Sequence, residues 1–397
     1  MTSLTSLERR YLLHSLFSRI GLSMTDLFGG FLLYEITGSI GVVLAVLSVA
    51  YIAGFVGRVV ALPLLLPLQR RFGGASVVAI SLALLAAANI GMYVFRDYFT
   101  DNLWALATFL MLWYVMNGFY YLFANAMKYA AISAHALPGS YSSYLEIVKA
   151  VSYITASIAA LWLNAGDNLL WLLVIAAVPL SLAVLPLRGM PLLSDQHASF
   201  RFSLRTIFGA LSMRAKSANI AYDIVAEFVS PIIPLFLILA FAESTKTPVE
   251  VTGLAFIAST VLLYASGILK DRKNPLFTGI ASIVFFLTFF AIPLGVGTSI
   301  LGTLLILFAL GRGIVTVAFD AELSREFSEG THPLEAAATI ETMRAFGGMV
   351  IMPIFLLIFL TTGGLPPWIF VIGALAVLPF ATYALKGGGG SRRAFVD

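Results

Sequence analysis

The sequence predicts an all-helical protein that crosses the membrane twelve times, and two observations lead to this fold class. Hydrophobic residues make up 60% of the 397 residues and charged residues only 11%, whereas about 25% of residues are charged in an ordinary soluble domain. The apolar residues form long runs without the alternation of a strand. Because lipid cannot satisfy backbone hydrogen bonds, such runs are typical of membrane-spanning helices.

Twelve segments are long enough to span, since a helix needs about 20 apolar residues to cross the hydrocarbon core. They fall into two sets of six. The first set is 11–36, 41–69, 74–95, 102–129, 142–164 and 168–187, and the second is 217–241, 249–269, 276–294, 298–322, 333–361 and 367–386. We expect a first half over residues 1–188 and a second half over residues 217–397, which ends in a short tail.

The basic residues lie in alternate loops, which indicates the orientation. They include Arg9, Arg70, Lys128, Arg325 and Lys386, whereas the opposite loops are mainly acidic. The positive-inside rule then places both termini in the cytoplasm, with the chain in the cell (inner) membrane. We see no small-residue cleavage site after the polar start, so we expect the first helix to remain in the mature protein.

The longest polar stretch, residues 189–216, is predicted to be a cytoplasmic linker between the halves. Within it, apolar residues from Phe202 to Leu211 alternate with basic ones. This pattern suits an amphipathic helix on an anionic lipid surface, and an early start of the seventh helix explains it equally well.

Composition also bears on partners and chemistry. The net charge is +4, but the basic residues are scattered, so we expect no nucleic-acid partner. There is no cysteine, no nucleotide-binding motif, and the four histidines are dispersed. We therefore expect no cofactor and no metal, and we disfavour an enzyme or an ATP-driven pump.

Polar positions inside the membrane repeat between the halves at one offset, since 312 minus 117 is 195. The related pairs are Asn117 with Arg312, Asn125 with Asp320, Glu146 with Glu341, and Lys149 with Arg344. Near the front of each half, Asp26 matches Glu227 at an offset of 201. The two halves are thus predicted to be related in parallel.

This organisation, with one loop motif, resembles the major facilitator superfamily. That superfamily carries Gly-x-x-x-Asp-Arg/Lys-x-Gly-Arg/Lys-Arg/Lys after its second and eighth spans. Here Gly267 is followed by Asp271, Arg272 and Lys273, and the first copy has Leu66 and Arg70 where glycine and aspartate are expected. The resemblance implies transport by alternating access, a binding site between the halves near the midplane, and a gating role for Asp271 and Arg272.

Ionisable residues deep in a span are functional candidates because they are costly unless they are paired or face a cavity. In the first span, Arg19 and Asp26 share one face and are candidates for substrate binding. The alternative is a neutralising arrangement of the two that only stabilises packing. In the seventh span, Asp223 and Glu227 form a stripe just before Pro231, where we expect a kink.

The pair Asp223 and Glu227 is the candidate for proton coupling, because two nearby buried acids favour the neutral form of one of them. Alternatively, Asp223 lies near enough to the cytoplasmic end to stay solvated. The other substrate-binding candidates share a face in the fourth or the tenth span. They are Asn117, Tyr121 and Asn125 in the fourth, and Arg312 and Asp320 in the tenth. Arg312 can hold an anionic group of the substrate or pair with an acid of the seventh span.

The remaining charges are candidates for gating. Glu146 with Lys149 and Glu341 with Arg344 are i, i+3 pairs, and each pair can simply neutralise itself. Arg58 lies at a similar depth to Glu341, and family packing places the second span against the eleventh, so we expect an Arg58–Glu341 ion pair between the halves.

These patterns together favour a monomeric secondary transporter of a small polar or charged solute, coupled to protons. The alternatives are a lipid or amphiphile flippase or exporter, or a sensor, on the same scaffold, and then a polytopic membrane enzyme. Aromatic residues such as Trp104, Trp113, Tyr114 and Tyr120 are interpreted as belt or packing residues. Glycines at positions 29, 30, 347 and 348 are interpreted as close-packing positions.

Overall fold

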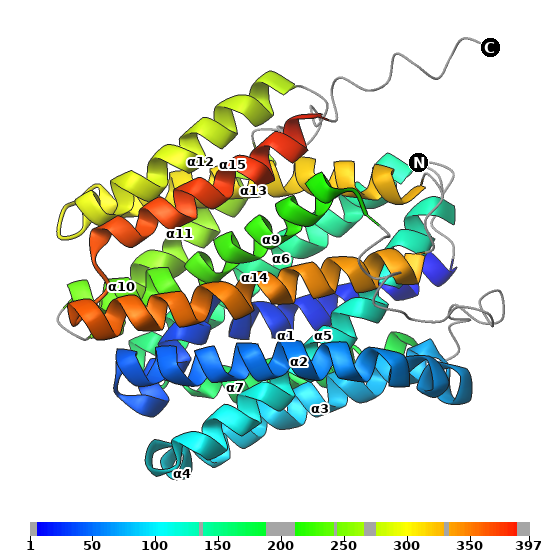
Figure 1. Ribbon diagram of the computed structural model, residues 1–397, viewed down its shortest axis with the longest axis horizontal. Helices are drawn as coiled ribbons and strands as arrows, with labels where there is room; N and C mark the ends of the chain where they lie inside the picture. Colours follow the sequence, from blue (N-terminus) through cyan, green and yellow to red (C-terminus); the bar gives the residue numbers. More distant parts are fainter. Residues whose placement is uncertain are drawn as a thin grey trace.

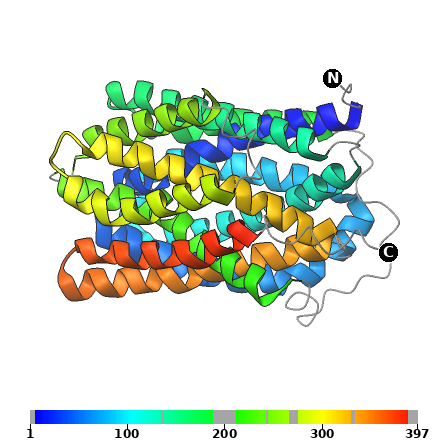
Figure 2. The same ribbon diagram turned by 90° about the horizontal axis from the view of Figure 1, so that it is seen from above.

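The chain folds into a bundle of long helices that run side by side along its longest axis (Figure 1, Figure 2). The computed structural model describes residues 6–134, 138–187, 211–241, 244–265, 275–328 and 333–386, and these residues contain helices and no strand. The end of the bundle where α1 begins is called the terminal end, and the opposite end the distal end.

The first part of the chain forms five long helices and two shorter ones. They are α1 (Ser6–Thr37), α2 (Ile40–Phe72), α3 (Gly74–Val94), the short α4 (Arg96–Asp101), α5 (Leu103–Ala134), α6 (Pro138–Ala165) and α7 (Trp171–Leu182), followed by the 3-10 helix η1 (Leu185–Leu187). Only Gly73 separates α2 from α3, and its φ of 77° allows this abrupt turn without a side-chain clash.

The second part begins with a composite helix made of α9 (Met213–Glu227), the π-helix η2 (Phe228–Ile232) and α10 (Ile233–Ala240). Pro231 lies inside the π segment, so the helical hydrogen-bond pattern changes where the kink was expected. The ring nitrogen of proline cannot donate the usual helical hydrogen bond. The remaining elements are α11 (Lys246–Ala265), α12 (Pro275–Gly295), α13 (Leu301–Ser328), α14 (Pro333–Thr362), the 3-10 helix η4 (Pro367–Ile369) and α15 (Phe370–Lys386).

Eleven helices within the described ranges are long and apolar enough to cross a membrane. The segment predicted as a span over residues 168–187 holds a shorter apolar helix, Trp171–Leu187, in which a turn separates α7 from η1. At 1.5 Å per residue, α7 covers about 18 Å, which is less than the hydrocarbon core of about 30 Å. The predicted linker lies largely outside the described residues. α9 begins at Met213, where the Ser212 side chain accepts a hydrogen bond from the Ala215 backbone at 3.2 Å.

The outer surface of the bundle is apolar, as expected of a surface that faces lipid. Large side chains such as Leu294, Leu357 and Leu360 are exposed on it. Four of the five tryptophans are exposed and lie near the distal ends of their helices: Trp104, Trp162, Trp171 and Trp368. Tryptophan gathers at the boundary between lipid and water. The protein is an integral membrane protein.

Helices from the two parts of the chain meet along several lines. α2 packs on α14 and α6 packs on α11, while α1 contacts η2 and α10. Gly30 makes the last contact close, because a side chain there would lie 3.0 Å from Pro231. These contacts surround the interior of the bundle, and the polar residues are found there.

Candidate functional site

A cavity of about 320 Å³ lies in the interior, bordered by α1, α2, α3, α5, α6, α7, α9, η2, α13 and α14. Its described lining contains five basic and five acidic side chains, namely Arg19, Arg58, Lys149, Arg312 and Arg344, and Asp26, Asp223, Glu227, Asp320 and Glu341. Ionisable groups are costly at membrane depth and accumulate where a protein binds or moves a ligand. This cavity is therefore the candidate site.

The structure brings most of the residues singled out from the sequence to this one cavity. All nine candidates for substrate binding and proton coupling line it, and so do four of the gating candidates: Arg58, Lys149, Glu341 and Arg344. Asp271 and Arg272 lie outside the described residues, and so does the side chain of Glu146.

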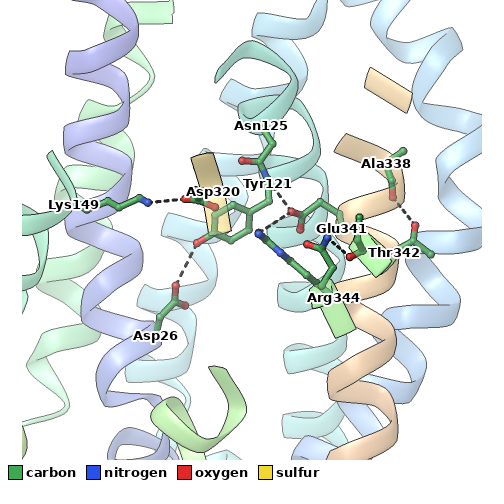
Figure 3. A network of polar contacts seen from close by, with 11 residues as sticks. Asp26, Tyr121, Asn125, Lys149, Asp320, Ala338, Glu341, Thr342 and Arg344 are labelled. Atoms are coloured by element: carbon green, nitrogen blue, oxygen red, sulfur yellow. Dashed lines mark hydrogen bonds and ion pairs between the residues drawn. The ribbon is translucent and has the colours of Figure 1, made fainter. Parts of the chain in front are cut away.

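Five of the lining residues form a bridging cluster between the two parts of the chain (Figure 3). Lys149 Nζ donates to Asp320 Oδ2 at 2.9 Å and joins α6 to α13. Asn125 Nδ2 donates to Glu341 Oε1 at 2.8 Å and joins α5 to α14. Arg344 Nη1 lies 3.5 Å from the same Glu341 oxygen. Every member of this cluster belongs to a pair of the 195-residue repeat.

Arg58 does not pair with Glu341, contrary to the sequence-based expectation. Its Nε and Nη2 donate to the Tyr114 carbonyl at 3.0 and 2.7 Å, while Glu341 binds Asn125 and Arg344. The reason lies in α5, where Gly118 carries no side chain. A Cβ at that position would collide with the Arg58 side chain, so the glycine opens the path to the carbonyl.

The two acids of α9 have different partners. Asp223 Oδ2 accepts a hydrogen bond from the Gly348 backbone nitrogen at 2.7 Å, and Glu227 Oε1 accepts one from the Tyr51 hydroxyl at 2.5 Å. Glu227 is 5% exposed, and its Oε2 has no hydrogen-bond partner among the described residues. One carboxylate is thus fixed to backbone, and the other keeps an oxygen open.

Arg312 forms no ion pair with these two acids, which was one of the two roles considered for it from the sequence. The basic residues that act electrostatically on Asp223 are Arg344 and Arg58. Arg312 interacts instead with Asp26 of α1.

On α1, Arg19 and Asp26 both line the cavity but form no ion pair with each other in the described structure. Arg19 Nε donates to Ser15 Oγ at 3.2 Å, and Asp26 Oδ2 accepts a hydrogen bond from the Tyr121 hydroxyl at 3.3 Å. Arg19 still acts on Asp26 electrostatically, without a direct contact between the two charges. Both charges remain at the cavity wall.

Asn117 and Arg312, which are related by the repeat, both keep polar groups open toward the cavity. Asn117 is buried, and its Oδ1 has no hydrogen-bond partner among the described residues. Arg312 makes no hydrogen bond or ion pair within the described ranges, and its charge interacts with Asp26 at longer range. Buried polar groups normally find partners, so such open groups indicate a ligand position.

Aromatic residues that were interpreted from the sequence as belt or packing residues also line the cavity. Tyr114 and Trp113 of α5 do so, and so does Tyr51, which was not singled out. The rings of Tyr51 and Tyr114 are 4.2 Å apart between centroids. The signal for Tyr114 was present in its spacing, because it precedes Asn117 by three residues and Tyr121 by seven and so shares their helix face.

Two glycines of α14 allow the close packing that was expected of them. A Cβ at Gly347 would lie 3.0 Å from the Asp223 Cβ, and one at Gly348 would overlap the Tyr51 ring. Without these side chains, α9 and α2 approach α14 closely enough for Asp223 to reach the Gly348 backbone.

Comparisons with known proteins agree with this architecture. No protein-family model matches the sequence, and no curated protein matches it. Among solved structures, a bacterial homologue of the iron transporter ferroportin in an outward-facing state is 16% identical, with a TM-score of 0.65 over 96% of this chain and 98% of that chain. A D-xylose–proton symporter has a TM-score of 0.69 at 12% identity, over 96% of this chain and 98% of that chain. An Escherichia coli fucose–proton symporter has a TM-score of 0.60 at 14% identity, over 96% of this chain and 98% of that chain.

These solved structures are transporters of the major facilitator superfamily, and this chain has their fold. The resemblance that the loop motif and the repeat suggested is therefore confirmed at the level of the fold.

Proposed function

We propose that the protein is a proton-coupled secondary transporter that moves a small polar or charged solute by alternating access between two six-helix halves. The observation that carries the proposal is the buried cavity lined by five basic and five acidic side chains where helices of both parts of the chain meet. A site between two halves that rock against each other is the arrangement that alternating access needs. The symporters among the similar folds support coupling to protons.

In this proposal the lining residues have separate tasks. Arg312 and Asn117 bind the solute, together with Arg19, Asp26 and Tyr121. Asp223 and Glu227 couple the protons. The bridging cluster controls access from the terminal end. The polar lining of the cavity favours a hydrophilic solute over a lipid.

The deciding experiment is transport by purified protein in liposomes. Radiolabelled sugars, nucleosides, amino acids, organic anions and divalent cations are tested one class at a time for counterflow and for uptake driven by a pH gradient. We expect counterflow of one class and pH-driven uptake of the same class. Protein that is folded and inserted but moves no solute of any class would contradict the proposal.

Arg312→Gln is expected to weaken solute binding by about ten- to a hundredfold, because a hydrogen bond to a charged group contributes about 1.5–3 kcal/mol. Binding is measured by the shift of the unfolding temperature with increasing solute. The matched control is Arg96→Gln, which removes a partly exposed arginine outside the cavity. Equal solute affinity in the two variants would show that Arg312 does not bind the solute.

We also propose that both termini and the segment around Asp195 face the cytoplasm. The chain has no cysteine, so single cysteines at position 195 and in the C-terminal tail can be labelled without interference. A membrane-impermeant maleimide should label them only after intact cells are permeabilised. Labelling of either position in intact cells would reverse the orientation.

A further inference from the structure

The cavity keeps one acid and one base open, and these two groups suggest the chemistry of the solute. In the acidic position, Glu227 Oε2 is buried and has no hydrogen-bond partner in the described part of the chain. In the basic position, the Arg312 guanidinium makes no hydrogen bond there. Other charges of the lining are already engaged, as in the Lys149–Asp320 and Glu341–Arg344 ion pairs.

The surroundings of Glu227 suit an organic cation. Its Oε1 is held by the Tyr51 hydroxyl at 2.5 Å, and the Tyr51 and Tyr114 rings lie 4.2 Å apart beside it. Both rings border the cavity. An ammonium group bound to a carboxylate oxygen gains additional attraction from the faces of neighbouring aromatic rings. A fixed carboxylate next to two tyrosines is therefore a good site for an amine.

The surroundings of Arg312 suit a carboxylate. The planar guanidinium can donate two parallel hydrogen bonds to the two oxygens of one carboxylate. Asn117 has an open amide at the repeat-related position of α5 and borders the same cavity. An amide supplies both a donor and an acceptor to a bound solute.

The two open groups belong to one short path. Asp26 borders the same cavity and interacts electrostatically with Arg312 and with Glu227. All three groups line a cavity of about 320 Å³, which holds a small molecule. A solute that fills this cavity can therefore contact both Arg312 and Glu227.

The charge balance of the lining supports a solute without net charge. With no proton bound to the coupling acids, the five basic and five acidic side chains compensate one another in a buried space. A simple anion or a simple cation would leave an uncompensated charge there, which is costly in a low-dielectric environment. A solute that carries one charge of each sign satisfies both open groups and keeps the balance.

We infer that the solute is a small zwitterion, of the amino-acid or betaine class, bound with its carboxylate on Arg312 and Asn117 and its ammonium group on Glu227 beside Tyr51 and Tyr114. This inference rests on the proposed transport function and adds the substrate class and its orientation in the cavity.

The test uses matched triplets of ligands on the purified full-length protein. Each triplet is a free amino acid, its amide, which keeps only the positive charge, and its N-acetyl derivative, which keeps only the negative charge. The panel covers the twenty standard amino acids together with glycine betaine. Binding is measured by calorimetry and by the shift of the unfolding temperature. At least one zwitterion should bind about tenfold or more tightly than both of its singly charged analogues.

Two variants then assign the orientation. Glu227→Gln should weaken binding of the zwitterion and of the amide while leaving binding of the N-acetyl derivative unchanged. Arg312→Gln should weaken binding of the zwitterion and of the N-acetyl derivative while leaving binding of the amide unchanged. If a singly charged analogue binds as tightly as its parent, or if no zwitterion of the panel binds, the inference is overturned.

The two proposals fail in different ways. If liposomes show counterflow of a sugar, a nucleoside or a simple ion and none of a zwitterion, secondary transport stands and the zwitterion inference is wrong. If a zwitterion binds with the expected pattern but neither counterflow nor uptake occurs, the substrate chemistry stands and the transport function is wrong.

Discussion

Glu227→Gln is expected to abolish net transport driven by a pH gradient, while counterflow continues at solute concentrations high enough to saturate the site. Glutamine keeps the size of the side chain and its hydrogen bond to Tyr51, but it cannot take up or release a proton. Counterflow needs only that the loaded protein reorients, whereas accumulation needs a proton to bind and leave in each cycle. The two assays therefore separate proton coupling from solute movement.

Several charged or titratable groups surround Glu227, and the experiment has to distinguish them. They are Asp223 on the same helix, Asp26 of α1, Tyr51 and Arg58 of α2, and Tyr114 of α5. Asp223→Asn is the informative comparison, because Asp223 accepts from the Gly348 backbone at 2.7 Å and is held in place. We expect it to keep more of the pH-driven transport than Glu227→Gln.

The matched control is Glu35→Gln, which makes the same chemical change near the distal end, where Glu35 accepts from the Thr245 hydroxyl. It should retain transport. If net transport keeps its full pH dependence in both Glu227→Gln and Asp223→Asn, the two acids are structural partners of neighbouring helices and the protons travel elsewhere.

Much of the candidate site follows from the sequence, because helical spacing determines which residues share a face. The intervals of four residues from Asn117 to Tyr121 and from Tyr121 to Asn125 place all three on one side of α5, and they line the cavity together. The same reasoning places Asp223 and Glu227 on one stripe of α9. The constant offset of 195 residues identifies the positions of the bridging cluster from the sequence alone.

What spacing could not supply is which residues meet across neighbouring helices. Arg58 reaches the Tyr114 carbonyl because Gly118 leaves room for it, and Glu227 binds Tyr51 because Gly348 lets α2 approach. These contacts depend on the rotation and depth of each helix against its neighbours. The length of α7 was overestimated for a similar reason, since hydropathy continues through a turn where the helix has ended.

The second prediction concerns the bridging cluster and is expected to change which side of the membrane can reach the cavity. Asp320 lies eight residues before the end of α13 at Ser328, about 12 Å from the terminal end, so its contact with Lys149 lies between that end and Arg312. In both residues the side chain is mostly buried, at 15% and 17% exposure. Leaving one charge of a buried pair without its partner is strongly destabilising.

Lys149→Asp and Asp320→Lys should each favour the state that is open at the terminal end, because each places two like charges where an ion pair joined α6 to α13. A differential effect of about 1.4 kcal/mol between the two states shifts their ratio tenfold. The double variant restores opposite charges in reversed positions, and it should recover part of the original ratio.

Accessibility is read from a single cysteine at position 23, in place of Ser23, which lines the cavity. This cysteine is labelled with an impermeant maleimide in vesicles of both orientations. We expect labelling from the terminal side to rise in each single variant and to fall again in the double variant. Labelling of the double variant at the rate of the single variants would show that the two charges do not act as a pair and that another contact closes this end.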